Sequence, residues 1–351
     1  MKKKESPKPI DLELTIGFIL KTEGGSSFSD GSLFFQRGVI MAEKQFIQTI
    51  ENQSFDGERA LYGEQKLLLE NCRFDGPTDG ESALKECSDI AVKNCLCNLR
   101  YPFWHNHYLA VESTELTPLC RAALWYSDHV EITASRLHGI KALRECGDVL
   151  LRGCDIVSPE FGWSVRNLRM EDCTAESEYF LLRSEQVFCS GLQFRGKYSF
   201  QYVSGAQLEN CVLDTKDAFW HSRNVTLRNC TVNGEYLAWY SDHLTLIHCK
   251  ITGTQPFCYC TDLRLIHCEM TGTDLCFEKS TVHAVLTSPM VSIKNPLRGK
   301  ITVPQLGELI RDDPLSRAEV VITGACTPGW RRPDRSGPGW GRAGRNWPAG
   351  R

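Results

Sequence analysis

The chain has 351 residues, of which 17 are cysteine, and a formal net charge of −3. Charged residues make up 24% of the chain, which argues against both a strongly basic nucleic-acid binder and a wholly disordered protein. No apolar run reaches the roughly 18 residues of a membrane-spanning helix. The basic N-terminus lacks a clean apolar stretch followed by a cleavage site, so we expect a cytoplasmic protein with reduced thiols and no disulfide framework.

In chain order, residues 1–40 are expected to form an N-terminal extension or cap, and residues 41–304 form a repeat region. The repeat is marked by an anchor position that is most often cysteine. The anchors are Gln53, Cys72, Cys95, Thr114, Ser135, Cys154, Cys173, Leu192, Cys211, Cys230, Cys249, Cys268 and Thr287. Ten of the 12 intervals are 19 residues, and the other two are 23 and 21. A period held over this length indicates a solenoid.

Each repeat holds two short segments with the alternation of β-strands, such as residues 218–222 and 225–232, and neither is long enough for a helix. Asn precedes five of the anchors, and Asn suits a left-handed corner; these are Asn52, Asn71, Asn94, Asn210 and Asn229. We therefore predict an all-β fold: a single-stranded right-handed parallel β-helix of about 12–13 coils. A leucine-rich repeat is the alternative, but its return segment is helical whereas this one is strand-like.

The period also predicts which columns of side chains face inward. One reads Leu61, Leu84, Phe103, Leu124, Leu143, Gly162, Leu181, Phe200, Phe219, Ala238, Phe257 and Cys276. A column of small residues, including Cys87, Asn106 and Ser127, follows three positions later. The anchor cysteines are best interpreted as small buried hydrophobes. Metal binding by Cys95 and Cys97 or by Cys258 and Cys260, and disulfides between coils, remain alternatives; we expect no metal and no cofactor.

Two neighbouring columns are predicted to face outward. The first, which we call the platform, reads Tyr62, Lys85, Trp104, Trp125, Arg144, Trp163, Leu182, Gln201, Trp220, Trp239, Cys258 and Phe277. It holds five of the eight tryptophans. The second reads Gly63, Glu86, His105, Tyr126, Glu145, Ser164, Arg183, Tyr202, His221, Tyr240, Tyr259 and Glu278. Two consecutive outward residues imply a bend between strands.

This aromatic and charged stripe is the candidate functional site. Stacked rings that only stabilise the solenoid are one interpretation, but exposed aromatic surface usually binds a ligand, and apolar rings beside charged groups suit sugars. The expected substrate-binding residues are Tyr62, Trp104, Trp125, Tyr126, Trp163, Tyr202, Trp220, His221, Trp239, Tyr240, Tyr259 and Glu278. The candidate catalytic residues are Lys85, Glu86, His105, Arg144, Glu145 and Arg183.

A glycoside hydrolase needs two carboxylates about 5–9.5 Å apart. Glu86 and Glu145 are three coils apart, roughly 14 Å, which leaves Asp128 and Asp148 as local partners. A lyase needs a base and a cation, for which the stripe offers His105, Tyr126, Lys85 and the two arginines.

After the repeats, residues 305–324 are expected to cap the solenoid, and residues 325–351 to form an Arg/Gly/Pro/Trp-rich disordered tail. The tail is interpreted either as a linker-like or RNA-binding segment or as a reading-frame accident. It carries an excess of arginine, so the rest of the chain is acidic, and we expect no nucleic-acid binding from the body.

The segments at 51–72, 101–105, 216–227, 234–246 and 277–286 resemble an uncharacterised bacterial domain-of-unknown-function family in the pectin-lyase-like, right-handed parallel β-helix superfamily. The resemblance covers about residues 41–324. It implies the fold but no activity, because the superfamily includes polysaccharide lyases, hydrolases and non-catalytic spikes. The leading hypothesis is a carbohydrate-active or carbohydrate-binding protein for acidic oligosaccharides. The alternatives are a non-catalytic β-helix that binds a protein partner or its own copy through the stripe, and a structural protein with no ligand.

Overall fold

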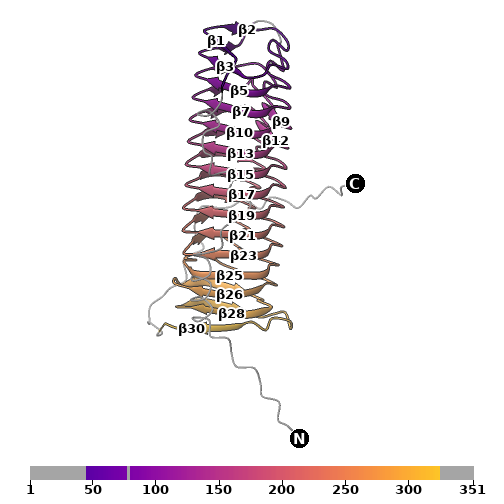
Figure 1. Ribbon diagram of the computed structural model, residues 1–351. Helices are drawn as coiled ribbons and strands as arrows, with labels where there is room; N and C mark the ends of the chain where they lie inside the picture. The colour runs from indigo at the N-terminus through magenta and orange to yellow at the C-terminus, as the bar shows by residue number, and fades with distance from the viewer. Residues whose placement is uncertain (1–44, 77–79, 325–351) are drawn as a thin grey trace. The chain divides into compact units, whose positions relative to one another are not determined.

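A computed structural model describes residues 45–76 and 80–324 of the chain, which form one parallel β-helix (Figure 1). The expected N-terminal extension, the C-terminal tail and residues 77–79 of an inserted loop lie outside the described residues. The described chain contains strands, turns and bends, and none of it is helical. Accordingly, no helix in this part of the chain has the length and apolar character needed to cross a membrane.

Two long parallel sheets run along the solenoid. Sheet 1 has 15 strands: β1 (Gln48–Glu51), β3 (Leu67–Glu70), β5 (Ser88–Lys93), β7 (His107–Glu112), β10 (Asp128–Thr133), β13 (Gly147–Arg152), β15 (Arg166–Glu171), β17 (Glu185–Ser190), β19 (Ser204–Glu209), β21 (Arg223–Arg228), β23 (Asp242–Ile247), β25 (Thr261–Cys268), β26 (Thr281–Leu286), β28 (Arg298–Val303) and β30 (Glu319–Ile322).

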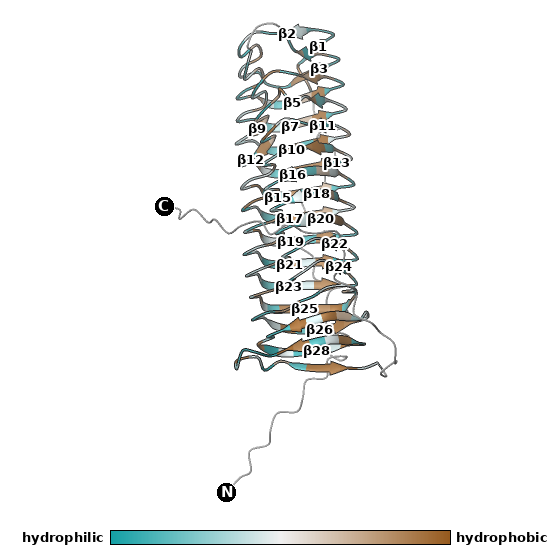
Figure 2. Cartoon of the chain, turned by 180° about the vertical axis from the view of Figure 1, so that it is seen from behind, coloured by the Kyte–Doolittle hydropathy of each residue, from teal (hydrophilic) through white to brown (hydrophobic). Residues whose placement is uncertain are grey.

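Sheet 2 has 11 strands, seen from behind in Figure 2: β2 (Ser54–Phe55), β4 (Arg73–Phe74), β6 (Leu96–Cys97), β8 (Glu115–Leu116), β11 (Arg136–Leu137), β14 (Asp155–Val157), β16 (Thr174–Glu178), β18 (Gln193–Lys197), β20 (Val212–Lys216), β22 (Thr231–Asn233) and β24 (Lys250–Thr252). Two small sheets pair β9 (Leu124–Trp125) with β12 (Leu143–Arg144), and β27 (Met290–Lys294) with β29 (Leu306–Ile310).

The strand register confirms the predicted 19-residue repeat and the right-handed parallel β-helix. Val225 of β21 pairs with Leu244 of β23, which pairs with Leu263 of β25. The solenoid is longer than the predicted 12–13 coils, because β28 and β30 continue sheet 1. Residues 305–324, which were expected to cap the solenoid, supply β29 and β30.

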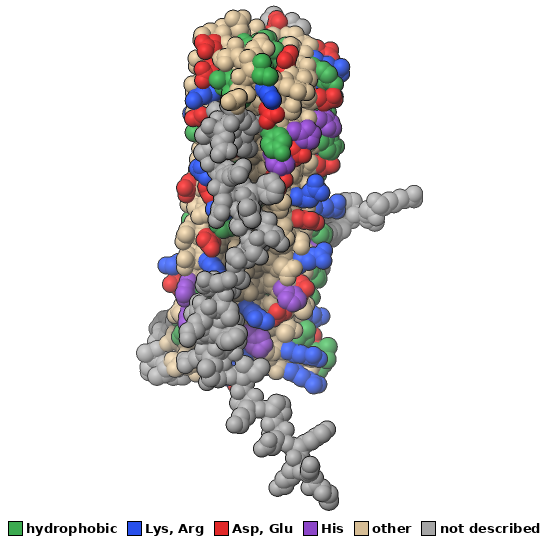
Figure 3. All heavy atoms as spheres, in the orientation of Figure 1, with side chains coloured by type: hydrophobic (Ala, Val, Ile, Leu, Met, Phe, Trp, Pro, Cys, Tyr) green, Lys and Arg blue, Asp and Glu red, His purple; other side chains and the backbone are tan. Residues whose placement is uncertain are grey.

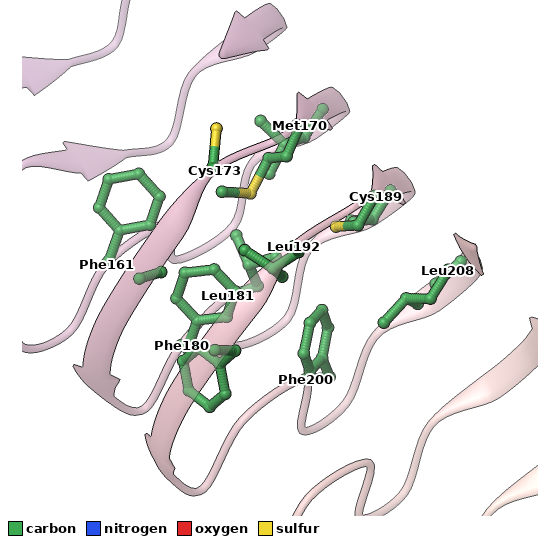
Figure 4. Close-up of a cluster of buried hydrophobic side chains, with 14 of the residues drawn as sticks. Phe161, Met170, Cys173, Phe180, Leu181, Cys189, Leu192, Phe200 and Leu208 are labelled. Carbon is green, nitrogen blue, oxygen red and sulfur yellow. The ribbon is translucent and has the colours of Figure 1, made fainter. Parts of the chain in front are cut away.

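The predicted inward columns form the core. The large side chains of the Leu/Phe column are buried, and Phe200 stacks on Phe219 with ring centroids 4.8 Å apart. Figure 4 shows a further inward column directly before it, where Phe161 and Phe180 stack at 5.6 Å. Gly162 follows Phe161, and a Cβ at Gly162 would lie 2.3 Å from the Leu181 side chain. Close packing of neighbouring coils therefore explains the one glycine in a Leu/Phe column.

The anchor cysteines are buried and hydrogen-bonded to the backbone. Cys230 Sγ donates to the carbonyl of Arg228 at 3.2 Å and to that of Leu208, in the preceding coil, at 3.5 Å. Ser135, an anchor without sulfur, donates its hydroxyl to the carbonyl of Thr133 at 2.7 Å. The 16 cysteines of the described residues are all free and buried. Within these residues, no group of three or more His, Cys, Asp or Glu side chains is arranged to hold a metal ion.

The corners before the anchors are left-handed, as predicted from the Asn residues. The φ angles of Asn52, Asn71, Asn94, Asn210 and Asn229 lie between 51° and 57°. A left-handed φ costs little for Asn because its side chain can hydrogen-bond locally. Asn at this position therefore has a conformational role.

The predicted phase is wrong near the end of the repeat region. Phe277 was expected on the platform, but it is fully buried and its ring stacks on Phe257 with centroids 6.0 Å apart. The coil between these two residues has 20 residues, so Glu278 occupies the platform position. The strand register then shifts in β25, where Cys268 pairs with Leu286, and Leu286 replaces the expected anchor Thr287. Cys258 also departs from the prediction, because it is fully buried although it lies on the platform.

One buried polar side chain, Asn106, allows the contribution of hydrogen bonding in the core to be tested. Asn106 Oδ1 accepts a hydrogen bond from the Cys87 amide at 2.9 Å, but Asn106 Nδ2 is buried without a partner in the described part of the structure. Ser127 occupies the same column, and its hydroxyl both accepts and donates. We expect Asn106→Ser to raise the free energy of unfolding by about 1 kcal/mol, because it removes an unsatisfied donor.

Urea unfolding monitored by circular dichroism measures this effect, and Asn106→Ala serves as the matched variant. Alanine also removes the acceptor for the Cys87 amide, so Asn106→Ala should be less stable than Asn106→Ser. Equal stability of the two variants would contradict this account.

The buried thiols should be chemically silent. All 16 thiols of the described residues are buried, which keeps reagents from reaching them. At Cys87 and Cys146 burial also raises the pKa, to about 11 and about 12, so less of the nucleophilic thiolate forms there. In a Cys326→Ser background, which removes the one cysteine outside the described residues, we expect no fast reaction with Ellman's reagent in native buffer. In denaturant the remaining 16 thiols should all react. A fast native reaction would show that a cysteine column is open to solvent.

Candidate functional site

The platform tryptophans are half-buried, and each uses its indole N–H within the solenoid. Trp220 Nε1 donates to the carbonyl of Tyr236 at 2.6 Å, and Trp239 Nε1 donates to that of Gln255 at 2.8 Å. Both acceptors are left-handed corner residues of the next coil. The other three bonds follow the same pattern: Trp104 to Ala122 (2.6 Å), Trp125 to Lys141 (3.2 Å) and Trp163 to Tyr179 (2.8 Å).

Gln201 shows that this bond is a property of the platform position. Its amide nitrogen donates to the carbonyl of Asp217, in the next coil, at 2.8 Å. An amide and an indole differ in shape, but both can place an N–H donor within hydrogen-bonding distance of the corner carbonyl. The platform side chain therefore satisfies a corner carbonyl of the next coil, which is a structural role.

Each platform tryptophan has at least one ring face covered by a platform neighbour. Trp104 and Trp125 stack with centroids 5.0 Å apart and planes 4° from parallel. Trp220 and Trp239 stack at 5.4 Å and 5°. Arg144 extends the first stack, because its guanidinium carbon lies 5.0 Å from the Trp125 ring and 5.4 Å from the Trp163 ring. The covered faces are not available to stack on a sugar.

The second outward column, which we call the outer ladder, is the more exposed of the two. Its rings also stack, with centroid distances of 4.9 Å for Tyr202 and His221, 5.0 Å for His221 and Tyr240, and 4.8 Å for Tyr240 and Tyr259. A second, shorter stack joins His105 to Tyr126 at 5.1 Å. The exposed fractions of Tyr126, Tyr202 and Tyr240 are 44%, 49% and 46%. The ladder therefore presents phenol and imidazole edges at one-coil intervals.

The backbone explains why two consecutive residues face outward. Outer-ladder residues are left-handed, with φ of 58° at Tyr202, 55° at His221 and 60° at Tyr240. A left-handed residue reverses the alternation of a strand and turns the chain toward the inward small-residue column. The predicted bend is thus confirmed. In the last of these coils the ladder position is Lys279, because the 20-residue coil moves Glu278 onto the platform.

The carboxylates of the stripe are engaged by neighbours. Glu86 accepts a hydrogen bond from the Tyr62 hydroxyl and lies 3.6 Å from Lys85 Nζ. The Tyr62 hydrogen bond is the main reason why the pKa of Glu86 is lowered and that of Tyr62 raised. Glu145 accepts from Arg144 Nε at 3.0 Å. Glu278 lies 3.0 Å from Lys294 Nζ, and its hydrogen bond raises the pKa of Lys294.

The candidate catalytic residues therefore fall into separate groups. The structure brings Lys85 and Glu86 together, and likewise Arg144 and Glu145. His105 instead stacks on Tyr126, and Arg183 lies over the Tyr202 ring at 5.8 Å. Among the expected substrate-binding residues, the tryptophans contribute ring edges and the outer-ladder residues contribute polar tips.

A cluster beside the stripe was only partly anticipated. Asp128 accepts from His107 Nδ1 at 2.6 Å and from His129 Nδ1 at 3.2 Å, and the next acidic residue, Asp148, binds Asn167 at 2.8 Å. Burial raises the pKa of Asp128, but the two histidine hydrogen bonds outweigh it, so the pKa is lowered. The sequence analysis named both aspartates but not the histidines. Extending the predicted columns by two positions beyond the small-residue column would have placed the histidines beside the aspartates.

Figure 3 shows Lys, Arg and His side chains gathered with acidic ones along the edge of the solenoid where β9 and β12 lie. A shallow hollow lies elsewhere, on the outer face of sheet 2 over β14, β16, β18 and β20. Its exposed lining is polar with two valines, and includes Thr174, Glu176, Gln193 and Arg195. None of the residues that line this hollow belongs to the aromatic stripe, so the two surfaces are distinct.

The chain belongs to the family described as a protein of unknown function (DUF3737), whose model matches residues 48–323. This confirms the family resemblance, and the curated proteins include no match.

Several solved β-helix structures are similar to the chain. One is the A-module of mannuronan C-5 epimerase AlgE4 from Azotobacter vinelandii, with 9% identity, coverage of 79% of this chain and 88% of that one, and a TM-score of 0.28. A second is PfbA, a surface adhesin of Streptococcus pneumoniae, with 10% identity, coverage of 76% and 71%, and a TM-score of 0.30. A third is the tailspike protein of E. coli bacteriophage HK620, in complex with a pentasaccharide, with 9% identity, coverage of 80% and 72%, and a TM-score of 0.31. At these identities and scores, the likeness carries no argument about what this chain binds.

The structural role of the platform can be tested at Trp220. We expect Trp220→Ala to lower the free energy of unfolding by about 3 kcal/mol, because it removes ring packing and the N–H donor together. Trp220→Gln should lose clearly less, because Gln201 makes the equivalent bond. Tyr202→Ala, at an exposed ladder position, should change stability by about 1 kcal/mol or less. Urea unfolding measures the stability of all three variants. Equal losses for the Ala and Gln variants of Trp220 would contradict the role of the platform side chain as a donor to the corner carbonyl.

Proposed function

We propose that this protein binds an elongated saccharide along the outer ladder and does not cleave it. The observation that carries the proposal is a continuous run of ladder residues in successive coils. The rings of Tyr202, His221, Tyr240 and Tyr259 stack on one another, and Arg183 lies over the Tyr202 ring at the start of the run. Phenol and neutral imidazole groups both donate to and accept from hydroxyl groups, and guanidinium groups donate to them. Their regular spacing suits a ligand with repeating polar groups.

The mode of recognition follows from the ring geometry. Since neighbouring rings cover one another's faces, a sugar meets ring edges and polar tips, and hydrogen bonding contributes more than stacking on a ring face. The ladder is also held in place by stacking, because His221 and Tyr240 each lie between two other rings. A fixed row of donors and acceptors reduces the entropy lost on binding.

Binding without cleavage is favoured by the state of the carboxylates. Cleavage by a pair of carboxylates needs one of them protonated as an acid. On this stripe Glu86 has a lowered pKa, and Glu145 and Glu278 are each paired with a cation. Glu86 and Glu145 also stand three coils apart, roughly 14 Å along the solenoid. The same arrangement suits a surface that orients a ligand by fixed charges.

Isothermal titration calorimetry with cellohexaose and hexagalacturonic acid tests the proposal. We expect at least one hexamer to bind more tightly than its dimer, because a longer chain engages more rungs of the ladder. The combined variant Tyr202→Ala, His221→Ala, Tyr240→Ala should weaken binding by about tenfold or more.

Tyr179→Ala is the matched control, since Tyr179 is 40% exposed and lies outside the ladder; it should bind as the unchanged protein does. Failure of both hexamers to bind, or an equal loss in the control, would refute a saccharide site on the ladder. Shortening of either hexamer during incubation would refute binding without cleavage.

A further inference from the structure

Arg144 is the most tightly held cation of the stripe. Its guanidinium lies between the rings of Trp125 and Trp163, at 5.0 Å and 5.4 Å, and its Nε donates to Glu145 at 3.0 Å. The side chain is only 30% exposed. In the described part of the structure Nε alone is hydrogen-bonded, which leaves the two η nitrogens of a fixed, planar fork for a ligand.

Beside this arginine the outer ladder carries a short side chain, Ser164, and we call this position the notch. Ser164 occupies the ladder position one coil after Glu145, where the neighbouring coils carry long side chains, and it is exposed. Its amide donates to the carbonyl of Leu182, and its hydroxyl makes no hydrogen bond to the described residues and can bind a ligand. The next ladder residue, Arg183, is exposed, lies over the Tyr202 ring at 5.8 Å and makes no ion pair among the described residues. The notch is therefore flanked by two guanidinium groups.

We propose that this notch is a subsite for one anionic group, a carboxylate or sulfate carried by the saccharide; the assignment rests on the proposed function. Arg144 and Arg183 are two coils apart, roughly 10 Å along the solenoid, so a group above Ser164 lies roughly 5 Å from the level of each. Both long side chains can reach it. Arg144 supplies a fixed pair of donors, Arg183 closes from the other side, and the Ser164 hydroxyl donates from below.

The local charge balance supports a single anion. Glu145 cancels one of the two arginine charges and at the same time fixes the Arg144 fork through Nε. Together Arg144, Glu145 and Arg183 leave one net positive charge at the notch. Ring faces on both sides of Arg144 exclude water from the guanidinium, which strengthens its interaction with an anion in the plane of the fork.

Calorimetry with hexagalacturonic acid and its carboxyl-reduced hexamer tests the subsite. The acid should bind more tightly, and its binding alone should weaken as salt is raised. Arg144→Gln and Arg183→Gln should each weaken binding of the acid by about tenfold, the effect of a lost charge-assisted hydrogen bond. Arg144→Gln should leave binding of the reduced hexamer unaffected, because Arg144 is not a residue of the outer ladder. Arg144→Gln is expected to fold, because glutamine already occupies the platform at Gln201.

Arg195→Gln, on the face of sheet 2, is the charge-matched control and should bind as the unchanged protein does. Equal affinity for the two hexamers, or equal losses in all three variants, would overturn the subsite while leaving the proposed function intact. If neither hexamer binds, the subsite is wrong, and the proposed function is wrong as well if cellohexaose also fails to bind. Sodium sulfate that binds as tightly as the acid hexamer would overturn the assignment to a saccharide.

Discussion

The whole structure depends on in-register pairing of parallel strands, coil over coil, at a spacing of roughly 4.8 Å. Under this constraint the nearest neighbours of any side chain are the residues at the same position of the preceding and following coils. A position must therefore hold residues that pack against their own kind. Phenylalanines stack on phenylalanines in the core, as Phe200 does on Phe219, and indoles stack on indoles at the platform. The residue type at a position is therefore constrained by the other residues of its column.

The same constraint explains how the corners are satisfied. Each turn away from a sheet leaves backbone groups that the strand ladder does not use, and buried ones must find partners. The anchors supply a small donor on the inner side, a thiol at Cys230 and a hydroxyl at Ser135. The platform supplies a long donor on the outer side, an indole at Trp220 and an amide at Gln201. Cysteine and tryptophan, the two residue types that stand out in the sequence, thus both donate hydrogen bonds to backbone carbonyls at the corners.

Much of this could be read from the sequence because alternation and period decide which side of the sheet a residue faces. The inward columns, the anchor corners and the two outward positions follow from them. The orientation of the rings does not, since a side-chain torsion depends on the coils above and below. The phase slip at Phe277 escaped prediction for a similar reason. The spacing is 20 residues from Phe257 to Phe277, returns to 19 from Leu263 to Val282, and a further shift then pairs Cys268 with Leu286. The histidines around Asp128 lie beyond the aromatic columns, on β7 and β10, so the column pattern did not predict them.

Ring orientation also moves the functional interpretation from the platform to the outer ladder. Tryptophans are costly to expose, and their column first suggested flat surfaces for sugars. Once their faces are stacked and their N–H groups bonded to the corners, they explain stability, and Trp→Gln at a platform position is the change that the fold should tolerate. The left-handed residue that follows each platform position is less constrained, because its side chain bonds to no corner carbonyl. Tyr, His, Arg and Glu therefore vary along the outer ladder within a fixed backbone, and recognition can be tuned there without cost to the coil.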